Sequence, residues 1–294
     1  KAIYFYQKSI TLRPDHETIL YNLGISLHSN NEYKKAAKQF ELINFRNCKS
    51  YLLSCHYKLN DKTSFIKELD NQIKKGDVNS IIGSLTYLAE TKYNINRNNS
   101  FCNSPLNFVL KTDLTEQYDF EDTFVKTTND ILLSDKVEKK FQGLLTNGFQ
   151  TAGNFFTQNG AVTKKIEEII YSEIEKYRSH FKESKEGFLK NWPNNYFING
   201  WLVSMKSGGS LSPHIHELGW LSGSLYINIP PKSKTDSGNL VVCMGENKDE
   251  TNKKKIIDIV TGSLCLFPAS LYHYTIPFES KEDRIVLAFD VLAK

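Results

Sequence analysis

The sequence predicts an α+β multidomain protein in which N-terminal helical repeats precede a jelly-roll β domain with flanking helices. Apolar residues recur at helical spacing through the first 95 residues, whereas eight short apolar or alternating runs, separated by turn residues, follow residue 196. The length of 294 residues allows two domains. We therefore expect a helical domain at 1–95 and a second domain at 96–294, with its β core at about 196–292.

The first 45 residues carry a repeated helical pattern. Leucines form one stripe over residues 20–27, and a second helix is predicted at 33–40. A shift of 34 residues aligns two pairs of positions, Ala36 with Ala2 and Phe40 with Tyr6. The pattern resembles the tetratricopeptide repeat (TPR), whose period is 34 residues. Because such stacks need about three repeats, we expect further repeats before Lys1. An ordinary helical hairpin remains the alternative.

Weaker helical patterns continue after this repeat. We expect degenerate or capping helices at 48–58, 61–75 and 77–92. The polar segment 94–100 then predicts the end of the helical stack and a linker. Residues 107–130 are too mixed to assign. Two more helices are predicted, one near 132–145 and a strongly periodic one at 161–181 that would pack on one side of the following sheet.

Eight short strands are predicted after residue 196. They are expected at 196–205, 212–217, 221–229, 239–244, 255–260, 263–267, 271–276 and 284–291. Glycine, proline and Asp-Ser-Gly turn signals separate them. Strands of this length and spacing favour a sandwich or jelly roll, and a two-sheet barrel of this kind can hold a metal in its mouth.

Charge and cysteine usage exclude several function classes. The net charge of +4 forms no dense basic stripe, so we expect no nucleic-acid partner. The sequence holds no apolar run of the roughly 20 residues that span a bilayer, so we expect no membrane association. The cysteines are odd in number and scattered, at positions 48, 55, 102, 243 and 265. That usage is typical of reduced thiols and favours a cytoplasmic location.

Three histidines form the candidate metal site. His214 and His216 are two residues apart in a predicted strand, so their side chains face the same way. His273, from a later strand, would complete a facial set with open positions opposite, as in non-haem iron(II) oxygenases. Those sites usually have two histidines and one carboxylate, so Glu217 is the second choice for the second ligand. On a regular strand Glu217 faces away, which favours the three histidines.

Arg284 is the candidate anion-binding residue. It begins an apolar strand, and a charged side chain that enters a buried strand needs a partner. The guanidinium fits a carboxylate best, which is either a protein Asp or Glu or the distal carboxylate of a dicarboxylic cosubstrate. The Tyr226 hydroxyl can reach the same carboxylate, and Asn199 on the first strand is a further candidate for cosubstrate contact.

A family resemblance joins these residues. The chain resembles the putative iron(II)/2-oxoglutarate-dependent oxygenase family, in a branch that often carries TPRs, through the segments His214-Ile-His216, Trp220–Tyr226, Gly262–Pro268, His273 and Arg284–Phe289. The resemblance implies a double-stranded β-helix fold with iron(II) and 2-oxoglutarate as cofactors. It implies that His214, His216 and His273 bind the metal, and that Arg284, assisted by Tyr226, binds the cosubstrate. The broader superfamily has an acid at the position of His216.

The sequence therefore predicts an iron(II)- and 2-oxoglutarate-dependent dioxygenase that hydroxylates a C–H bond. TPRs present a concave protein-binding surface, so the first expectation for the substrate is a protein or peptide side chain. A small metabolite is the runner-up. Two alternatives remain open: an inactive TPR and jelly-roll scaffold, and a cupin-type metal enzyme that does not use 2-oxoglutarate.

Overall fold

The computed structural model describes residues 1–134, 137–158 and 160–294. Their contacts divide the chain into two compact units, Lys1–Asn103 and Ser104–Lys294. The first unit therefore includes the segment 94–100, which the sequence predicts as a linker.

The N-terminal unit is a series of helices. They are α1 (Ala2–Leu12), α2 (Glu17–Ser29), α3 (Tyr33–Glu41), α4 (Cys48–Lys58), α5 (Lys62–Lys75) and α6 (Ser80–Tyr93). Every helix predicted between residues 20 and 92 lies within or overlaps one of them. That these helices are TPRs stays a prediction.

Gly24 explains why a small residue stands in the middle of α2. A Cβ atom built there would lie 2.5 Å from Cε1 of Phe40, so the ring of α3 occupies the space of the missing side chain. The Phe40 ring is buried and stacks on Tyr51 of α4 at a centroid distance of 5.6 Å. The glycine thus lets three successive helices share one aromatic core.

A buried polar chain also ties the later helices together. Ser50 of α4 donates to Gln72 of α5 at 3.0 Å, and Asn79 donates to the Ser50 hydroxyl at 2.9 Å. Asn79 also caps α6, because its side chain accepts from the Ile82 amide. These hydrogen bonds pair polar groups that would destabilise the folded unit if they were buried without partners.

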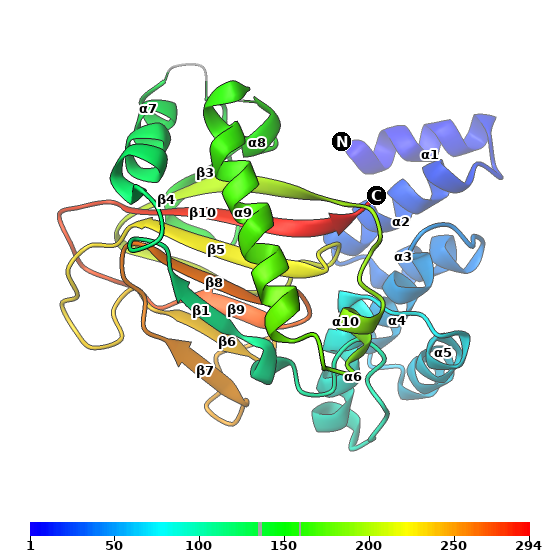
Figure 1. The fold of residues 1–294 in the computed structure, drawn as a ribbon. Coiled ribbons are helices and arrows are strands. Elements are labelled where there is room, and N and C mark those ends of the chain that lie inside the picture. The colour runs from blue at the N-terminus through cyan, green and yellow to red at the C-terminus, as the bar shows by residue number, and fades with distance from the viewer. Residues whose placement is uncertain (135–136, 159) are drawn as a thin grey trace. The chain divides into compact units, whose positions relative to one another are not determined.

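The C-terminal unit is built on an antiparallel sheet that folds over on itself (Figure 1). Its strands are β1 (Leu110–Asp113), β2 (Lys139–Lys140), β3 (Leu145–Thr151), β4 (Tyr196–His214), β5 (Leu221–Asn228), β6 (Leu240–Cys243), β7 (Lys254–Ile257), β8 (Ser263–Pro268), β9 (Tyr272–Thr275) and β10 (Arg284–Ala293). The strand order is β1-β8-β5-β10-β4-β9-β6-β7, with β3 pairing β4 and β2 pairing β3. The architecture is α+β with a jelly-roll type of closed antiparallel sheet.

Strand β4 joins the two layers. Residues 196–205 pair with β10, whereas Leu211 and His214 pair with β9. The sequence predicts two strands here, at 196–205 and 212–217, and this is wrong. The Ser207-Gly208-Gly209 segment is a bend within one strand, with Gly208 at φ +74°. The strand ends at His214, so His216 lies just beyond it.

The remaining helices of this unit are short apart from α9. They are η1 (Pro105–Phe108), η2 (Glu121–Lys126), α7 (Thr127–Leu133), α8 (Phe155–Gln158), α9 (Ala161–His180) and α10 (Gly187–Lys190). The helix predicted near 132–145 is wrong. Only residues 132–133 of that range are helical, 139–140 form β2, and 135–136 lie outside the described residues. Strand β1, η1, η2 and part of α7 occupy the segment that the sequence left unassigned.

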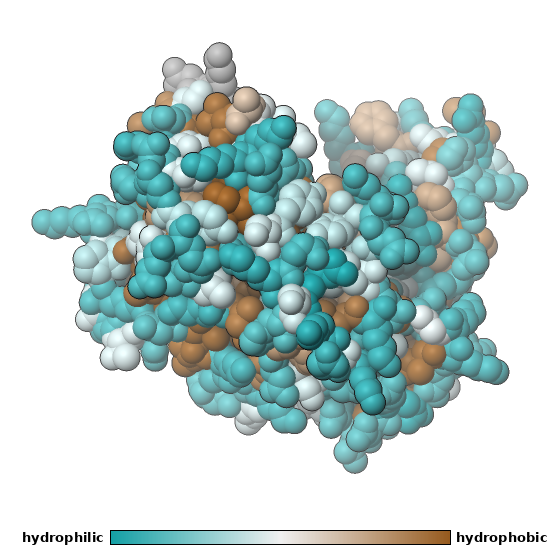
Figure 2. All heavy atoms as spheres, viewed as in Figure 1, coloured by the Kyte–Doolittle hydropathy of each residue, from teal (hydrophilic) through white to brown (hydrophobic). Residues whose placement is uncertain are grey.

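Helix α9 covers one face of the sheet, as its periodicity predicts (Figure 1). Its buried stripe includes Ile166, Ile170 and Ile174, and Glu175 accepts a hydrogen bond from Tyr196 at the start of β4. Hydrophilic side chains dominate the molecular face that Figure 2 draws. Within the described ranges, we find no helix with the length and apolar character needed to cross a bilayer.

Two glycines on this outer face accept aromatic rings. A Cβ atom at Gly223 of β5 would lie 2.1 Å from Cζ of Phe289, and one at Gly200 of β4 would lie 2.6 Å from Cε2 of Phe156. The outer face of the sheet is therefore packed closely, and the neighbours of Gly223 on β5, Ser222 and Ser224, point to the opposite, inner face.

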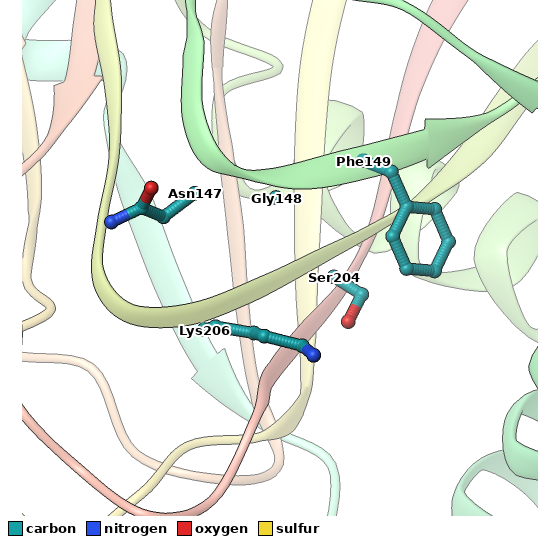
Figure 3. Close-up of a pocket in the computed structure, with 5 residues that line it drawn as sticks. All are labelled: Asn147, Gly148, Phe149, Ser204 and Lys206. Carbon is teal, nitrogen blue, oxygen red and sulfur yellow. The ribbon is translucent and has the colours of Figure 1, made fainter.

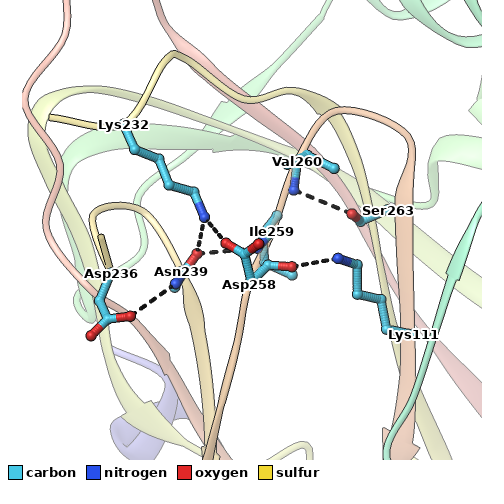
Figure 4. A network of polar contacts seen from close by, with 8 residues as sticks. All are labelled: Lys111, Lys232, Asp236, Asn239, Asp258, Ile259, Val260 and Ser263. Atoms are coloured by element: carbon cyan, nitrogen blue, oxygen red, sulfur yellow. Dashed lines mark hydrogen bonds and ion pairs between the residues drawn. The ribbon is translucent and has the colours of Figure 1, made fainter. Parts of the chain in front are cut away.

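A polar network fastens the loops at the end of the β6, β7 and β8 region (Figure 4). Its centre is Asn239, which is 1% exposed. The Asn239 side-chain oxygen accepts from Lys232 at 2.6 Å and from the amide of Ile259 at 3.1 Å. Lys232 also pairs with Asp258, and Lys111 of β1 donates to the Asp258 carbonyl. This network has a structural role, because it joins three loops.

Candidate metal centre

Three histidine side chains meet at one end of the interior of the C-terminal unit. His214 is the last residue of β4, and the register of β4 and β9 places it directly opposite His273. His216 follows two residues later, beyond the end of the strand. The ring centroids of His214 and His273 are 4.2 Å apart, and that of His216 lies 5.2 Å and 4.8 Å from them, respectively. The structure thus brings together the three histidines that the sequence singles out.

The spacing of the ring nitrogens suits a metal ion. The Nε2 atoms of His214 and His216 are 3.3 Å apart, and one nitrogen from each of the three rings lies within 4.8 Å of the others. Histidine nitrogens bind transition metals at about 2.1 Å, so two ligands of one ion are separated by roughly 3 to 4 Å. The 3.3 Å separation already lies in this range, and the rings would have to move for all three nitrogens to bind one ion.

The other ring nitrogens are held by hydrogen bonds. Nδ1 of His214 lies 2.9 Å from the Ser212 carbonyl oxygen, and Nδ1 of His273 lies 3.4 Å from that of Leu271. A carbonyl oxygen only accepts, so each Nδ1 carries the proton and each Nε2 presents a lone pair. The fold therefore prepares these two rings for metal binding through Nε2.

Burial keeps two of the rings uncharged. Desolvation, with a smaller contribution from the neighbouring His216, lowers the pKa of His214 to about 4. Desolvation and the two neighbouring histidines lower the pKa of the fully buried His273 well below its ordinary value. Neutral imidazole is the form that binds a metal, so at neutral pH these rings are ready to accept a cation.

Glu217 does not take part in the cluster. It lies in the turn after His216 and is half-buried. Among the described residues, the group placed to hold a metal at this point consists of His214, His216 and His273. The geometry therefore favours His216 over Glu217 as the second ligand, and the metal would have three neutral ligands.

The inward residues of the sheet form rows beside this cluster. The registers of β4, β10, β5 and β8 place them as a first row of Asn199, Asp290, Ser222 and Phe267, a middle row of Trp201, Ala288, Ser224 and Cys265, and a third row of Val203, Val286 and Tyr226. The first row touches the histidines, because Phe267 lies 5.0 Å from the His273 ring and Asp290 contacts His216. Asn199 therefore lies at the metal end of the interior.

Arg284 lies at the other end of the interior, beyond the third row and opposite Met205. It is 2% exposed, and its guanidinium carbon is 5.1 Å from the centroid of the Tyr226 ring. Its Nε has no hydrogen-bond partner, and among the described residues no carboxylate forms an ion pair with it. A buried charge with an unsatisfied donor is costly unless a ligand completes it.

Two residues of the middle row, Ala288 and Ser224, are partly exposed between buried neighbours on their own strands. On β10, Val286 and Asp290 are buried, whereas Ala288 between them is partly exposed. On β5, Tyr226 is buried and Ser224 is partly exposed. Small side chains thus leave the interior accessible between the histidines and Arg284, which is where a cosubstrate that contacts both would lie.

Sequence reasoning missed two residues of the site, Asp290 and Ser222. Nδ1 of His216 lies 2.5 Å from Oδ1 of Asp290, and the Ser222 hydroxyl donates to the same oxygen at 2.8 Å. The period of two along β10 was the available signal. A strand whose Arg284 points inward also points Asp290 inward, six residues later.

The family comparison agrees with this geometry. Residues 199–290 match the model of the family described as putative 2OG-Fe(II) oxygenase. This segment is therefore similar to that family. The matched segment contains all three histidines and Arg284. The cofactors of a 2OG-Fe(II) oxygenase are iron(II) and 2-oxoglutarate, and the histidine cluster and the buried guanidinium fit these two groups. No curated protein sequence matches the chain.

Solved structures of 2OG-Fe(II) oxygenases resemble the chain only distantly. A Pseudomonas putida prolyl-4-hydroxylase has a TM-score of 0.45 at 10% identity, covering 72% of this chain and 98% of its own. A Trichoplax adhaerens prolyl hydroxylase bound to a hypoxia inducible factor peptide has 0.45 at 13%, covering 75% and 92%. HygX from Streptomyces hygroscopicus, with nickel and 2-oxoglutarate, has 0.44 at 10%, covering 63% and 83%. Likeness at this level does not indicate a substrate.

A second hollow lies between β3 and β4 (Figure 3). Its lining consists of Asn147, Gly148, Phe149, Ser204 and Lys206. Ser204 alternates with the inward-facing Val203 and Met205 on β4, so this hollow opens on the outer face of the sheet. It contains none of the histidines and is separate from the candidate metal centre.

Proposed function

We propose that the protein is an iron(II)- and 2-oxoglutarate-dependent dioxygenase that hydroxylates a protein or peptide side chain. The observation that carries the proposal is that the interior of the C-terminal unit holds two groups that a bound ligand would complete, the histidine cluster and Arg284. Three histidines converge at one end, where the metal-binding group among the described residues contains no carboxylate, and a buried Arg284 has an unpartnered Nε at the other. A metal-bound dicarboxylate completes both.

The residues of this chain have distinct tasks in such a reaction. His214, His216 and His273 would hold iron(II) on one side and leave its other positions open. Arg284 would bind the distal carboxylate of 2-oxoglutarate in a bidentate manner. Tyr226 would assist it, because burial raises the pKa of its hydroxyl and keeps it a neutral donor. When bound, the iron and 2-oxoglutarate supply the oxidising chemistry.

The protein residues also control water. The interior between the histidines and Arg284 has buried apolar side chains on either side of the partly exposed middle row. A cosubstrate that covers Ala288 and Ser224 would displace solvent from this row, and exclusion of water protects a reactive oxidant from side reactions.

The class of substrate rests on the N-terminal unit. Stacked helical repeats offer extended surfaces for peptides, and the aromatic core around Phe40 makes this unit a stable scaffold. We therefore favour a protein or peptide substrate over a small metabolite.

Cosubstrate binding is the first test. Under anaerobic conditions, 2-oxoglutarate is titrated into the iron(II)-loaded protein and into the Arg284→Gln variant, and binding is followed by calorimetry. Loss of one partner of a buried charge pair typically costs 2 to 5 kcal/mol, so we expect about 30-fold weaker binding or more. Equal affinity in the variant contradicts the proposal and favours a cupin-type site.

Turnover and substrate class are tested together. The protein is incubated in a cell extract with iron(II), 2-oxoglutarate and isotopically heavy dioxygen, and succinate and labelled products are measured. Label in the protein fraction supports the proposal. Label confined to small molecules would assign a metabolite substrate, and binding of both cofactors without any succinate would favour the scaffold.

A further inference from the structure

We propose that Asp290 is a positioning residue of the metal centre. Held by Ser222, it fixes the ring of His216 and supplies, through that ring, the negative charge that a three-histidine ligand set lacks. The inference rests on the proposed function only in requiring that the three histidines bind a divalent metal.

The contact between Asp290 and His216 is short and doubly supported. Oδ1 of Asp290 lies 2.5 Å from Nδ1 of His216 and accepts a hydrogen bond of 2.8 Å from the Ser222 hydroxyl. The same hydroxyl lies 3.2 Å from Nδ1 of His216. The carboxylate, the hydroxyl and the ring therefore form a closed triangle.

Rigid elements hold this triangle in place. The register of β10 and β5 places Asp290 directly opposite Ser222, in the centre of the sheet. The two residues are 7% and 1% exposed, respectively. A ligand-orienting group on paired strands is held more firmly than one on a loop, and His216, which lies beyond the end of β4, needs such support.

Among the described residues, Asp290 has no lysine or arginine partner. Its side-chain partners there are His216 and Ser222. A buried carboxylate normally has a cationic partner or takes part in metal binding. A divalent cation on the far side of the His216 ring provides that partner through the imidazole.

Two consequences follow for the metal. Because Asp290 accepts a hydrogen bond from the Nδ1–H group of His216, the lone pair of Nε2 is on the side of His214, whose Nε2 is 3.3 Å away. Because the carboxylate makes the ring a stronger donor, the ligand set gains electron density. The His216 and Asp290 pair thus replaces electrostatically the carboxylate that usual sites of this type bind directly.

Metal affinity is the readout that separates this role from a packing role. Cobalt(II), which has a visible spectrum that reports on its ligands, is titrated into the full chain and into Asp290→Asn. Loss of a ligand's outer partner typically weakens metal binding about 10- to 100-fold. We expect a loss in that range, with an altered cobalt spectrum, while the apo variant retains the melting behaviour of the apo protein.

A matched control removes the same charge elsewhere. Asp258 lies on the exposed side of the same unit and pairs with Lys232. Asp258→Asn should leave the cobalt affinity and spectrum unchanged. Ser222→Ala, which frees Asp290 from its support, should weaken cobalt binding by a few-fold, and it decides the matter if Asp290→Asn does not fold.

The possible failures are distinguishable. If the wild-type chain binds cobalt(II) and Asp290→Asn binds it within about 2-fold and with the same spectrum, the role of Asp290 is overturned and the proposed oxygenase stands. If the wild-type chain binds no cobalt(II), both are overturned. Equal losses in Asp290→Asn and Asp258→Asn would show a general effect of charge and would also overturn the specific role.

Discussion

Arg284→Met tests whether the buried guanidinium is retained for ligand binding at the expense of stability. Arg284 is 2% exposed and its Nε has no partner, while the rest of its guanidinium contacts the ring and hydroxyl of Tyr226 and the sulfur of Met205, which is 4.0 Å from Nη1. Methionine has a similar length and carries neither charge nor donors, so the variant removes the unsatisfied group without a large cavity.

The expected effect is a gain in stability. An unsatisfied buried charged donor costs about 1–3 kcal/mol, and the lost cation–π contact offsets about 1 kcal/mol of that. The free energy of unfolding of the C-terminal unit should therefore rise by up to about 2 kcal/mol, and its Tm by up to roughly 8 °C. The variant should also lose the stabilisation by 2-oxoglutarate, which at 100 times Kd amounts to about 2.7 kcal/mol for the wild type.

Urea unfolding and calorimetry, with and without manganese(II) and 2-oxoglutarate, measure both effects. Arg178→Met is the matched control, because Arg178 of α9 is partly exposed and already paired with Glu175 at 2.8 Å. The Arg178→Met variant should show no gain in the free energy of unfolding, and 2-oxoglutarate should still stabilise it. A loss of stability in Arg284→Met, or an undiminished response to 2-oxoglutarate, would refute the reasoning.

Three further predictions concern packing, access and pH. Gly223→Ala should lower the free energy of unfolding by about 1–3 kcal/mol in urea titrations, because the Phe289 ring fills the Cβ position; an unchanged midpoint would contradict this. Ser224→Leu fills the middle row and should weaken 2-oxoglutarate binding at least about 10-fold in calorimetry with little change in cobalt affinity; parallel losses would show a general disruption. Burial, with a contribution from Lys58, lowers the pKa of His28 to about 4 from 6.5, so the unfolded chain takes up the proton first as pH falls. The free energy of unfolding of the N-terminal unit should therefore drop by about 2–3 kcal/mol between pH 6.5 and pH 4, a drop that His28→Gln removes from urea titrations; the same pH dependence in both proteins would be inconsistent with a buried neutral His28.

The helices of the N-terminal unit were predictable because their information is local. Leucines at helical spacing predict α2, and the spacing of Ala36 and Phe40 predicts α3. The packing of Phe40 against Gly24 is visible only in the structure. The helix predicted at 132–145 is wrong for the same reason. Its local pattern favours a helix, whereas the register of β2 with β3 is set by tertiary pairing that no short window contains.

The metal-binding histidines and Arg284 could be predicted from the sequence. The residues that hold His216 in place could not. His214 and His216 are close in sequence, and His273 and Arg284 follow at a spacing that the family resemblance explains. Asp290 and Ser222 are 68 residues apart in sequence, and their meeting depends on the register of β10 with β5. A one-residue shift of that register would turn both away from His216, so only the assembled sheet reveals their role.

The bend of β4 shows a similar limit. Ser207-Gly208-Gly209 has the composition of a turn between two strands. In the structure it lets one strand pair with β10 and then with β9, and this crossing places His214 opposite His273.

Anomalous diffraction from crystals grown anaerobically with iron(II) tests the central claim most directly. The account predicts one iron peak at about 2.1 Å from a ring nitrogen of each of His214, His216 and His273. A peak bound by Glu217 in place of His216, or no peak between the three rings at saturating iron(II), would contradict it.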